Sequence, residues 1–233
     1  MPALPEINNR LAFDALIFDL DGTLIDSLPD LQGALNGMLD GLSRRRLSAA
    51  EVRGMIGDGT PFLVKRALAA TGGVIDIEEA HQRFLQLYEN RLARESQLYP
   101  GVAETLSAFR ADGVRLGVCT NKQQVPTLAV LKAFGIADYF SVIVGGDAVP
   151  LRKPNPAHLL AVMEKLGVAG SDAVMVGDNE NDYAVARAVG VPVILMRYGY
   201  LRVPPESLSP DAWLDDFAAI PQTVRRIRGG RTA

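Results

Sequence analysis

The sequence predicts an α/β protein in which a doubly wound parallel sheet carries an inserted helical cap. Short apolar runs rich in β-branched residues each end at a polar cluster, and helical patterns separate these runs. One long segment breaks the alternation, because it contains helical patterns and no clear strand. Runs that are apolar on both faces indicate parallel strands covered by helices, and their alternation with helices indicates a doubly wound sheet.

The expected strands and helices follow one another along most of the chain. Strands are expected at residues 15–18, 114–119, 142–144, 173–176 and 191–196, with a short last strand near 212–214. Helices are expected at residues 102–111, 126–134, 157–166 and 182–189. Ligands bind such sheets at the carboxyl ends of the strands, and the polar clusters fall at those ends.

The segment from residue 28 to about residue 98 is expected to form the cap. Its apolar residues recur at helical spacing, as at Leu31, Leu35 and Met38. An insert that directly follows the first strand must emerge at the carboxyl edge of the sheet. The chain thus divides into an α/β core of residues 1–27 and 99–233 and a helical cap of residues 28–98.

Three glycines recur every four residues on the first expected cap helix, at Gly33, Gly37 and Gly41. Each costs a helix up to about 1 kcal/mol relative to alanine, so their presence calls for a reason in packing. We expect the backbone of another segment to pack closely against this face of the helix.

Composition argues against several classes of protein. The formal net charge of −3 over 233 residues gives no basic footprint for nucleic acid, and a single cysteine excludes an intramolecular disulfide and a multi-cysteine metal site. No segment reaches the roughly 18 apolar residues of a membrane span, and residues 1–10 lack the pattern of a signal peptide. We expect a cytoplasmic protein that binds neither membranes nor nucleic acid, as a monomer or a homodimer.

The first polar cluster reads DLDGT at residues 19–23 and follows the first expected strand. Residues two apart point the same way in a strand, so Asp19 and Asp21 can reach one small volume at the strand end. Two carboxylates held together divide their roles, because one stays ionised as a nucleophile while the other holds a proton. Gly22 permits a tight turn here, and the alternative is a solvated Asp-rich turn without function.

The second cluster reads GDNEND at residues 177–182, where another expected strand ends and a helix begins. Asp178 and Asp182 would share a face within a helix, although acidic residues at a helix start are also ordinary caps. Magnesium prefers oxygen ligands and usually takes one or two carboxylates together with substrate phosphate. Asp19, Asp178 and the backbone carbonyl of Asp21 would suffice as its ligands.

Two further clusters supply groups for a phosphate. Lys153 lies in a proline-stiffened segment before an expected helix, where a fixed ammonium could neutralise phosphate charge and the carboxylates. Thr120 and Asn121 directly follow a strand, and a hydroxyl and an amide can donate to phosphate oxygens without adding charge. The alternatives are a surface lysine and an ordinary strand-end turn.

Other reactive residue types are expected to be structural. His81 and His158 both sit in helical patterns. Cys119 is expected to be a buried strand residue and not a nucleophile, because no positive group is evident beside it. The run YGY at residues 198–200 is expected to be a turn near the cap, and no role is assigned to it.

The four clusters, in this order, resemble the four motifs of the haloacid dehalogenase superfamily. The run FDLDGTLIDS at residues 18–27 resembles its phosphoglycolate phosphatase branch, as do RGMIGDG at 53–59, YPGV at 99–102 and RKP at 152–154. That branch has a helical cap after the first strand of a Rossmann-like core. It often has asparagine where this chain has Asp58, and serine where it has Asn179, so the resemblance implies the chemistry more firmly than the substrate.

The resemblance implies a mechanism for a magnesium-dependent phosphomonoester hydrolase. Asp19 would attack phosphorus to form an aspartyl phosphate, and Asp21 would protonate the leaving oxygen and then activate water. Mg²⁺ would bridge Asp19, the Asp21 carbonyl, Asp178 and phosphate. Asp182 would lie beside these ligands or occasionally be one of them.

The resemblance also implies how substrate is held. Thr120, Asn121 and Lys153 would bind the transferring phosphoryl group. A cap loop at residues 57–59 would place backbone amides over a small acidic substrate such as 2-phosphoglycolate, unless it is only a turn between helices. Arg53 is either a partner for a substrate carboxylate or a solvated helix residue. The loop consists of Gly57, Asp58 and Gly59.

Several alternatives remain open on the same residues. A phosphomutase would use Asp19 and Asp21 to pass phosphate to a sugar, and a pyrophosphatase would differ only in substrate. A dehalogenase would not need Asp21 or magnesium. A non-catalytic regulatory module would be expected to lack at least one of the motif carboxylates, all of which are present.

Overall fold

The computed structural model describes residues 13–73 and 76–229. The expectation about a signal peptide concerns residues 1–10, which lie outside the described residues. Within the described part of the chain, no helix is both long enough and apolar enough to cross a membrane.

A six-stranded parallel sheet forms the centre of the molecule, with the strand order β5-β4-β1-β6-β7-β8. Strand β1 pairs with β4 on one side and β6 on the other, so that Phe18 lies opposite Val118 and Val176. The strands of this sheet are β1 (Ala15–Phe18), β4 (Arg115–Cys119), β5 (Val142–Val144), β6 (Ala173–Gly177), β7 (Val193–Met196) and β8 (Ala212–Leu214). The doubly wound parallel sheet expected from the sequence is confirmed.

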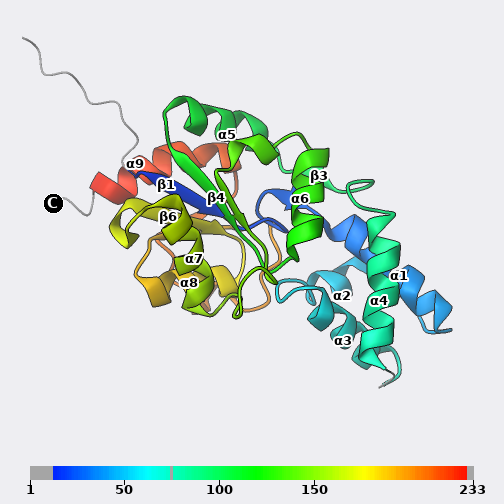
Figure 1. The fold of residues 1–233 in the computed structure, drawn as a ribbon. Helices are drawn as coiled ribbons and strands as arrows, with labels where there is room; N and C mark the ends of the chain where they lie inside the picture. The colour runs from blue at the N-terminus through cyan, green and yellow to red at the C-terminus, as the bar shows by residue number, and fades with distance from the viewer. Residues whose placement is uncertain (1–12, 74–75, 230–233) are drawn as a thin grey trace, which may run out of the picture.

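Helices cover both faces of the sheet (Figure 1). Leu16 and Phe18 of β1 pack in one core with residues of α5, α6 and α9, whereas Ala15 and Ile17 pack in another core with residues of α7 and α8. This explains why β1 is apolar at every position, since both of its faces are buried. The five helices are α5 (Val102–Ala111), α6 (Gln124–Ala133), α7 (Pro156–Leu166), α8 (Glu180–Val189) and α9 (Ile220–Gly229).

Short 3₁₀ turns connect several of these elements. They are η1 (Ala137–Tyr139), η2 (Gly170–Asp172), η3 (Pro205–Ser207) and η4 (Phe217–Ala219). The strands β1, β4, β6 and β7 all point toward the same edge of the sheet, because each of them pairs in parallel with its neighbour. The polar clusters of the sequence therefore meet at one edge.

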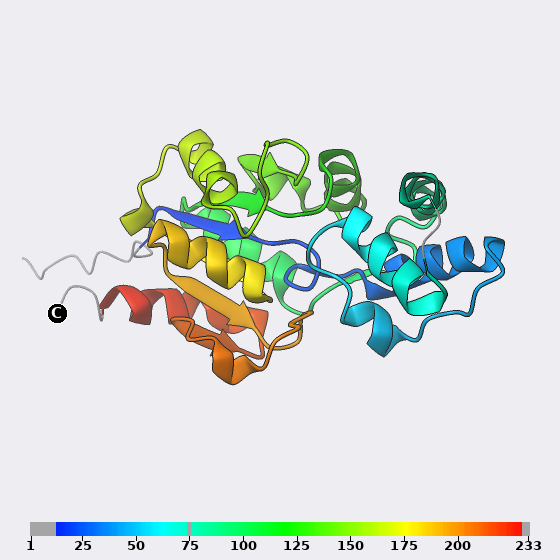
Figure 2. The ribbon, with the colours of Figure 1, turned by 90° about the horizontal axis from the view of Figure 1, so that it is seen from below.

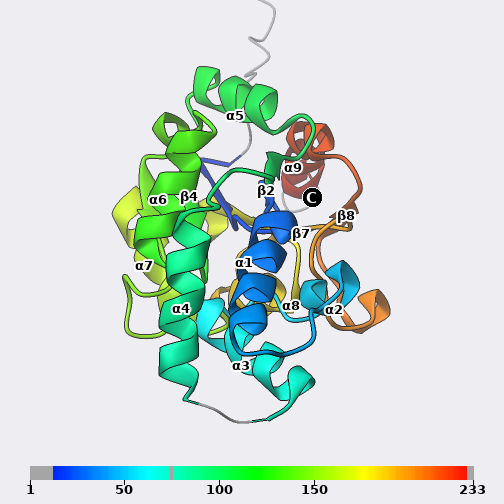
Figure 3. The same cartoon turned by 90° about the vertical axis from the view of Figure 1, so that its right-hand side faces the viewer.

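Four helices lie together beyond this edge, and we call them the cap (Figure 2). They are α1 (Leu28–Gly41), α2 (Ala49–Arg53), α3 (Thr60–Thr71) and α4 (Ile77–Glu89). Their buried side chains form a separate cluster, to which Leu35, Val64 and Phe84 belong and which Tyr200 joins from the sheet part. Figure 3 shows α1 and α4 in front of the strand ends.

A short two-stranded ladder and a short helix in this region differ from the expected helical insert. Strand β2 (Ile25–Asp26) pairs in antiparallel fashion with β3 (Gln97–Leu98), so the chain leaves the sheet and returns to it side by side. Helix α2 is only five residues long. Neither element shows a hydrophobic period in the sequence, because two and five residues are too few to display one.

The glycine face of α1 packs on side chains, which corrects the expectation of a closely packed backbone. A Cβ added at Gly33 would lie 2.5 Å from the Arg91 side chain, and one added at Gly37 would lie 3.4 Å from that of Leu87. A Cβ added at Gly41 would lie 2.1 Å from the Arg83 side chain. The glycines thus make room for long side chains on the helix that runs alongside. Arg83 and Leu87 belong to α4, and Arg91 lies in the turn after it.

Candidate active site

Asp19 lies directly after β1, where it is 5% exposed and its backbone N–H still donates to the Val176 carbonyl. The chain then turns sharply, because three successive amides from Thr23 onward donate to the Leu20 carbonyl. Gly22 has a φ of +91°, and a Cβ there would lie 2.4 Å from an oxygen of Asp178. Only glycine permits both this backbone conformation and this close approach.

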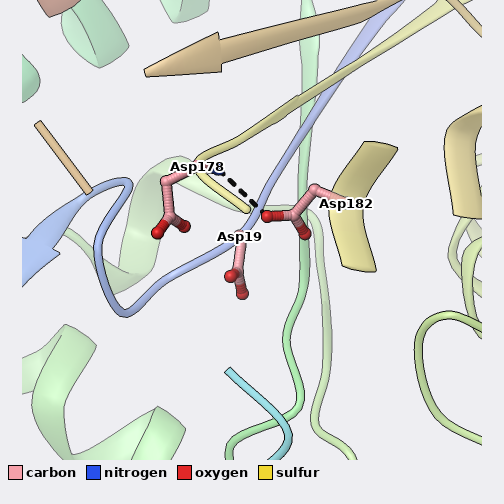
Figure 4. A group of neighbouring side chains, drawn as sticks. All are labelled: Asp19, Asp178 and Asp182. Carbon is pink, nitrogen blue, oxygen red and sulfur yellow. Dashed lines mark hydrogen bonds between the residues drawn. The ribbon is translucent and has the colours of Figure 1, made fainter. Parts of the chain in front are cut away.

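Three buried aspartates converge at the strand ends (Figure 4). One carboxylate oxygen from each of Asp19, Asp178 and Asp182 lies within 4.8 Å of the others. Asp178 follows β6, and Asp182 lies in the first turn of α8, where it forms a capping box with Asn179. The Asp182 carboxylate accepts hydrogen bonds from the Asp178 and Asn179 amides at 3.0 and 3.3 Å.

Lys153 supplies the cation of this cluster. Its Nζ lies 2.6 Å from Asp182 Oδ1 and 3.0 Å from Asp19 Oδ1, and its side chain is 1% exposed. The contact with Asp19 lacks the alignment of a hydrogen bond, so Asp19 Oδ1 is a buried oxygen without a hydrogen-bond donor. The lysine is therefore a buried residue of the site and not a surface residue.

Burial controls the protonation of these groups. It raises the pKa of Asp19 to about 6, with Lys153 opposing the shift and Asp182 adding to it. Burial also raises the pKa of Asp178 well above its ordinary value, and the charges of Asp182 and Asp19 add to the shift. For Lys153, burial alone would lower the pKa, but the two carboxylates outweigh it and raise the pKa. The cluster thus holds more buried negative charge than one lysine balances.

This donor set fits a divalent cation. Both oxygens of Asp182 are engaged, one by Lys153 and one by backbone amides. Asp19 Oδ1 pairs with Lys153 but accepts no hydrogen bond from the described residues, and Asp178, which accepts from Thr23 Oγ1 at 2.9 Å, stands beside it. A hard cation between the carboxylate oxygens would offset both the burial and the mutual repulsion that raise the pKa values of Asp19 and Asp178. The three aspartates could therefore hold a metal ion.

Asp21 lies apart from this cluster, with its side chain 16% exposed. Lys122 Nζ donates to both of its carboxylate oxygens at 3.0 Å and to the hydroxyl of Tyr88, on cap helix α4, at 2.6 Å. Sequence reasoning assigned no role to Lys122 or Tyr88. Lys122 directly follows the Thr-Asn pair, and this position at the strand end was the one signal available.

Thr120 and Asn121 lie where the sequence places them, at the end of β4, but the Asn121 side chain differs from expectation. Its Nδ2 donates to the Gly57 and Lys153 carbonyls, each at 3.0 Å, and its Oδ1 has no hydrogen-bond partner. Both amide hydrogens are therefore used, and the side chain is no phosphate donor in this arrangement. Asn121 instead joins the cap loop to the segment that carries Lys153.

The cap loop at residues 57–59 docks on the sheet part. The Gly57 carbonyl accepts from Asn181 Nδ2 at 3.2 Å as well as from Asn121. The Asp58 carboxylate forms ion pairs with Arg66 of the cap and Arg202 of the segment after β7. Burial alone would raise the pKa of Asp58, but these contacts outweigh it and hold the pKa below its usual range. The side chain of Asp58 is thus committed to the contact between cap and sheet.

A pocket lies between the cap and the strand ends. It brings Asp19, Asp21, Thr120 and Asn121 together with the two glycines of the cap loop, whereas Asp58 lies outside its lining. The remaining lining residues are Leu31, Ile56, Thr60 and Leu63 of the cap and Lys122 of the sheet part. Gly59 precedes the first residue of α3, so the pocket borders the amino end of that helix.

Tyr200, to which sequence reasoning assigned no role, supports the site. Its backbone N–H donates to Asp178 Oδ2 at 2.6 Å, and its hydroxyl accepts from the Ser27 and Leu28 amides where the cap begins. Arg53 Nη1 donates to the carbonyls of residues 198 and 199, so this side chain is docked on the sheet part and is not a solvated helix arginine.

The histidines and the cysteine are buried, as the sequence predicts for structural residues. His158 accepts from the Lys153 amide at 3.2 Å, and burial together with Lys153 lowers its pKa to about 4. His81 Nε2 lies 2.9 Å from Thr60 Oγ1. Burial raises the pKa of Cys119 to about 12, so its thiol stays protonated at neutral pH.

Comparison with known proteins places this chain in a family. The model of the haloacid dehalogenase-like hydrolases matches residues 13–190. A phosphoglycolate phosphatase of Rhodospirillum rubrum is 46% identical over 213 residues, which cover 88% of each chain. A phosphoglycolate phosphatase of Caulobacter vibrioides is 41% identical, with 95% of this chain and 93% of the relative covered.

A solved structure agrees with the sequence relatives. The crystal structure of a predicted phosphoglycolate phosphatase from Haemophilus somnus superimposes with a TM-score of 0.87 at 35% identity. The match covers 91% of this chain and 97% of that one. These similarities support an enzyme, a phosphatase, as the motifs predict. The chain belongs to the family of haloacid dehalogenase-like hydrolases.

Proposed function

We propose that the protein is a phosphomonoester hydrolase that works through an aspartyl phosphate on Asp19. The observation that carries this proposal is the different surroundings of two aspartates that line one pocket. Asp19 is buried beside Lys153 and two further carboxylates, whereas Asp21 is more exposed and paired with Lys122. A cation held by the acidic cluster would keep Asp19 ionised as the nucleophile, whereas Asp21, whose side chain lies outside that cluster, would be left to transfer protons.

In the first step, a carboxylate oxygen of Asp19 attacks phosphorus while the bond to the leaving oxygen breaks. Asp21 gives its proton to that oxygen, so an alcohol departs and a phosphoryl group remains on Asp19. Lys153 would balance charge on the transferring group, and the Thr120 hydroxyl would donate to one of its oxygens. Asn121 acts indirectly, because its amide fixes the Lys153 segment against the cap loop.

In the second step, water attacks phosphorus and Asp21 accepts its proton. The bond between phosphorus and Asp19 breaks, which releases inorganic phosphate, restores the Asp19 carboxylate and returns Asp21 to its protonated form. A bound metal ion would supply charge neutralisation for the phosphoryl group. We propose Mg²⁺, held by Asp19, Asp178 and the Asp21 carbonyl, because these are hard oxygen donors. Asp182 would orient Lys153 and the Asp178 loop.

The proposed substrate is 2-phosphoglycolate or a similarly small acidic phosphomonoester. The names of the sequence relatives support this choice. The pocket also borders the amino end of α3 and the glycines at 57 and 59, where backbone N–H groups favour an anion such as a carboxylate. The division into a core of residues 1–27 and 99–233 and a selecting cap of residues 28–98 is part of this proposal.

A phosphate-release assay tests the proposal. The purified protein is incubated with 2-phosphoglycolate, a sugar phosphate, pyrophosphate and 4-nitrophenyl phosphate, with Mg²⁺ or with EDTA. We expect Mg²⁺-dependent release of inorganic phosphate, fastest from 2-phosphoglycolate, and none from well-folded Asp19→Asn. Transfer of phosphate to a sugar without release would indicate a mutase, and full turnover by Asp19→Asn would rule out Asp19 as nucleophile.

A further inference from the structure

Lys122 occupies an unusual position among the charged residues of the site. Its ammonium is 1% exposed and meets three acceptors, namely the two oxygens of Asp21 at 3.0 Å each and the Tyr88 hydroxyl at 2.6 Å. An ammonium has three N–H donors, so this set uses its full capacity. Contact with both oxygens fixes the position of the Asp21 carboxylate as well as its charge.

Tyr88 brings the cap into this contact. It is 2% exposed on α4, where its ring stacks on that of Phe84 with centroids 5.7 Å apart. Lys122 Nζ also lies 4.8 Å from the centre of the Tyr88 ring. The ring is thus held by the packing of α4, and its hydroxyl position follows the position of that helix.

The charge of Lys122 is secure despite its burial. Burial alone would lower the pKa of this lysine, but Asp21 and Tyr88 outweigh it and raise the pKa above its ordinary value. Lys122 is therefore a permanent cation between a cap hydroxyl and the aspartate that we assign to proton transfer.

The Tyr88 hydroxyl is one of several contacts between the cap and the sheet part. Asp58 pairs with Arg202, and the Gly57 carbonyl accepts from two asparagines, so a separate set of contacts holds the cap loop on the sheet part. Loss of one hydroxyl on α4 leaves all of these contacts in place. What distinguishes the Tyr88 contact is that its partner, Lys122, also contacts Asp21.

We propose that Lys122 and Tyr88 are positioning residues that place the Asp21 carboxylate for proton transfer, and that Tyr88 makes this placement depend on helix α4. The inference rests on the proposed function, in which Asp21 protonates the leaving oxygen. Displacement of a reacting group by about 1 Å can cost on the order of 100-fold in rate. Such a loss appears only where the leaving group needs a proton.

Tyr88→Phe tests the inference, because it keeps the ring and removes the hydroxyl. Single-turnover phosphorylation is measured with 2-phosphoglycolate, whose alcohol leaving group needs a proton, and with 4-nitrophenyl phosphate, whose leaving group does not. We expect Tyr88→Phe to slow the first substrate about tenfold or more and the second less than about threefold. Asp21→Asn provides the reference pattern for complete loss of the acid.

Arg202→Met is the matched comparison, because it loosens the cap loop without touching Lys122. It should change KM for 2-phosphoglycolate without the leaving-group pattern of Asp21→Asn. Equal losses on both substrates in folded Tyr88→Phe, or no loss, would overturn the inference. If that variant does not fold by circular dichroism, Lys122→Met must show the same split between substrates.

The outcomes also separate this inference from the proposed function. Wild-type protein that hydrolyses neither substrate would overturn both. Wild-type activity with the leaving-group pattern in Asp21→Asn, but not in Tyr88→Phe or Lys122→Met, would overturn only the roles of Lys122 and Tyr88.

Discussion

Asp19 combines burial with negative charge, and this combination has a cost in stability. Burial raises its pKa from 3.8 to about 6, so the folded protein holds this proton at a pH where the unfolded chain has lost it. The contribution of Asp19 to folding stability therefore decreases as pH rises from about 4 to about 6 and stays unfavourable above. A shift of this size corresponds to on the order of 3 kcal/mol without a metal ion.

Asp19→Asn should therefore stabilise the metal-free protein at neutral pH. The amide keeps the shape of the side chain and removes the buried charge, while Lys153 keeps its partner Asp182. We expect urea unfolding in EDTA at pH 7.5 to show a gain of about 1–3 kcal/mol over wild type. The gain should shrink at pH 4, where the wild-type carboxyl is protonated. A less stable variant at pH 7.5 would contradict this account.

The site also shows which residues a sequence pattern can identify. Asp19, Asp178 and Lys153 follow strand ends or precede a helix, so local signals mark them and the sheet brings them together. Along the sequence, Lys122 is 101 residues from its partner Asp21 and 34 residues from its partner Tyr88. No local sequence pattern links positions so far apart. The same holds for Tyr200, whose partner Asp178 is 22 residues away.

At the scale of elements, the strands were predictable because each is a short apolar run buried on both faces. The bounds of β1, β5 and β8 agree with expectation, and β4, β6 and β7 differ by one or two residues. Helix packing was less predictable. The glycines of α1 were expected to admit a backbone, but α4 and the turn after it place side chains over them.

Alanine is expected to have opposite effects on stability at Gly37 in α1 and at Gly117 in β4. A Cβ at Gly37 would meet the Leu87 side chain at 3.4 Å, an ordinary contact, so Gly37→Ala should stabilise the protein by up to about 1 kcal/mol through helix propensity. A Cβ at Gly117 in β4 would lie 2.9 Å from Leu166 and 3.1 Å from Val162, so Gly117→Ala should destabilise it by about 1–3 kcal/mol. Thermal unfolding measures both, and a destabilising Gly37→Ala would restore the idea of a closely packed backbone.

The cap loop allows a test of selectivity. Gly59 has a φ of +90°, and a Cβ there would lie 2.9 Å from the Asn121 carbonyl oxygen. Gly59→Ala should therefore push the loop off the strand ends and raise KM for 2-phosphoglycolate about tenfold or more. The KM for 4-nitrophenyl phosphate should change much less, since this substrate makes few contacts with the cap.

Gly54→Ala is the control for this loop, because Gly54 ends α2 with a φ of −70° and a Cβ there would make only contacts of 3.6 Å or longer. It should leave both KM values near wild type. Unchanged KM for 2-phosphoglycolate in folded Gly59→Ala would mean that the loop is only a turn and that selectivity lies elsewhere.

At the scale of the whole molecule, the position of the cap followed from the sequence, but its contacts did not. An insert after β1 must emerge at the carboxyl edge of the sheet, which is where α1 to α4 lie. Asp30 anchors the return of the chain, because its buried carboxylate accepts from the Arg94, Glu95 and Ser96 amides. The composition of the segment around residue 30 does not disclose this anchor.

The acidic cluster joins β1, β6 and α8, so occupation by a metal ion should stabilise the whole molecule. A ligand that binds only the folded state adds RT ln(1 + [L]/Kd), about 2.7 kcal/mol at 100 times Kd. We expect Mg²⁺ to raise the Tm of wild type by several degrees. Asp178→Asn should abolish the rise, whereas Asp215→Asn, which removes an 84% exposed carboxylate elsewhere, should retain it.

Calcium separates binding from chemistry in the same experiment. It is larger than Mg²⁺ and takes more oxygen ligands, so it should raise the Tm through the same carboxylates while supporting little phosphate release. The size of the ion then decides whether Asp19 reaches phosphorus in line with the leaving oxygen. An equal Tm rise in Asp178→Asn, or full turnover after exhaustive chelation, would show that the acidic cluster is not the metal site and that the raised pKa of Asp19 serves another purpose.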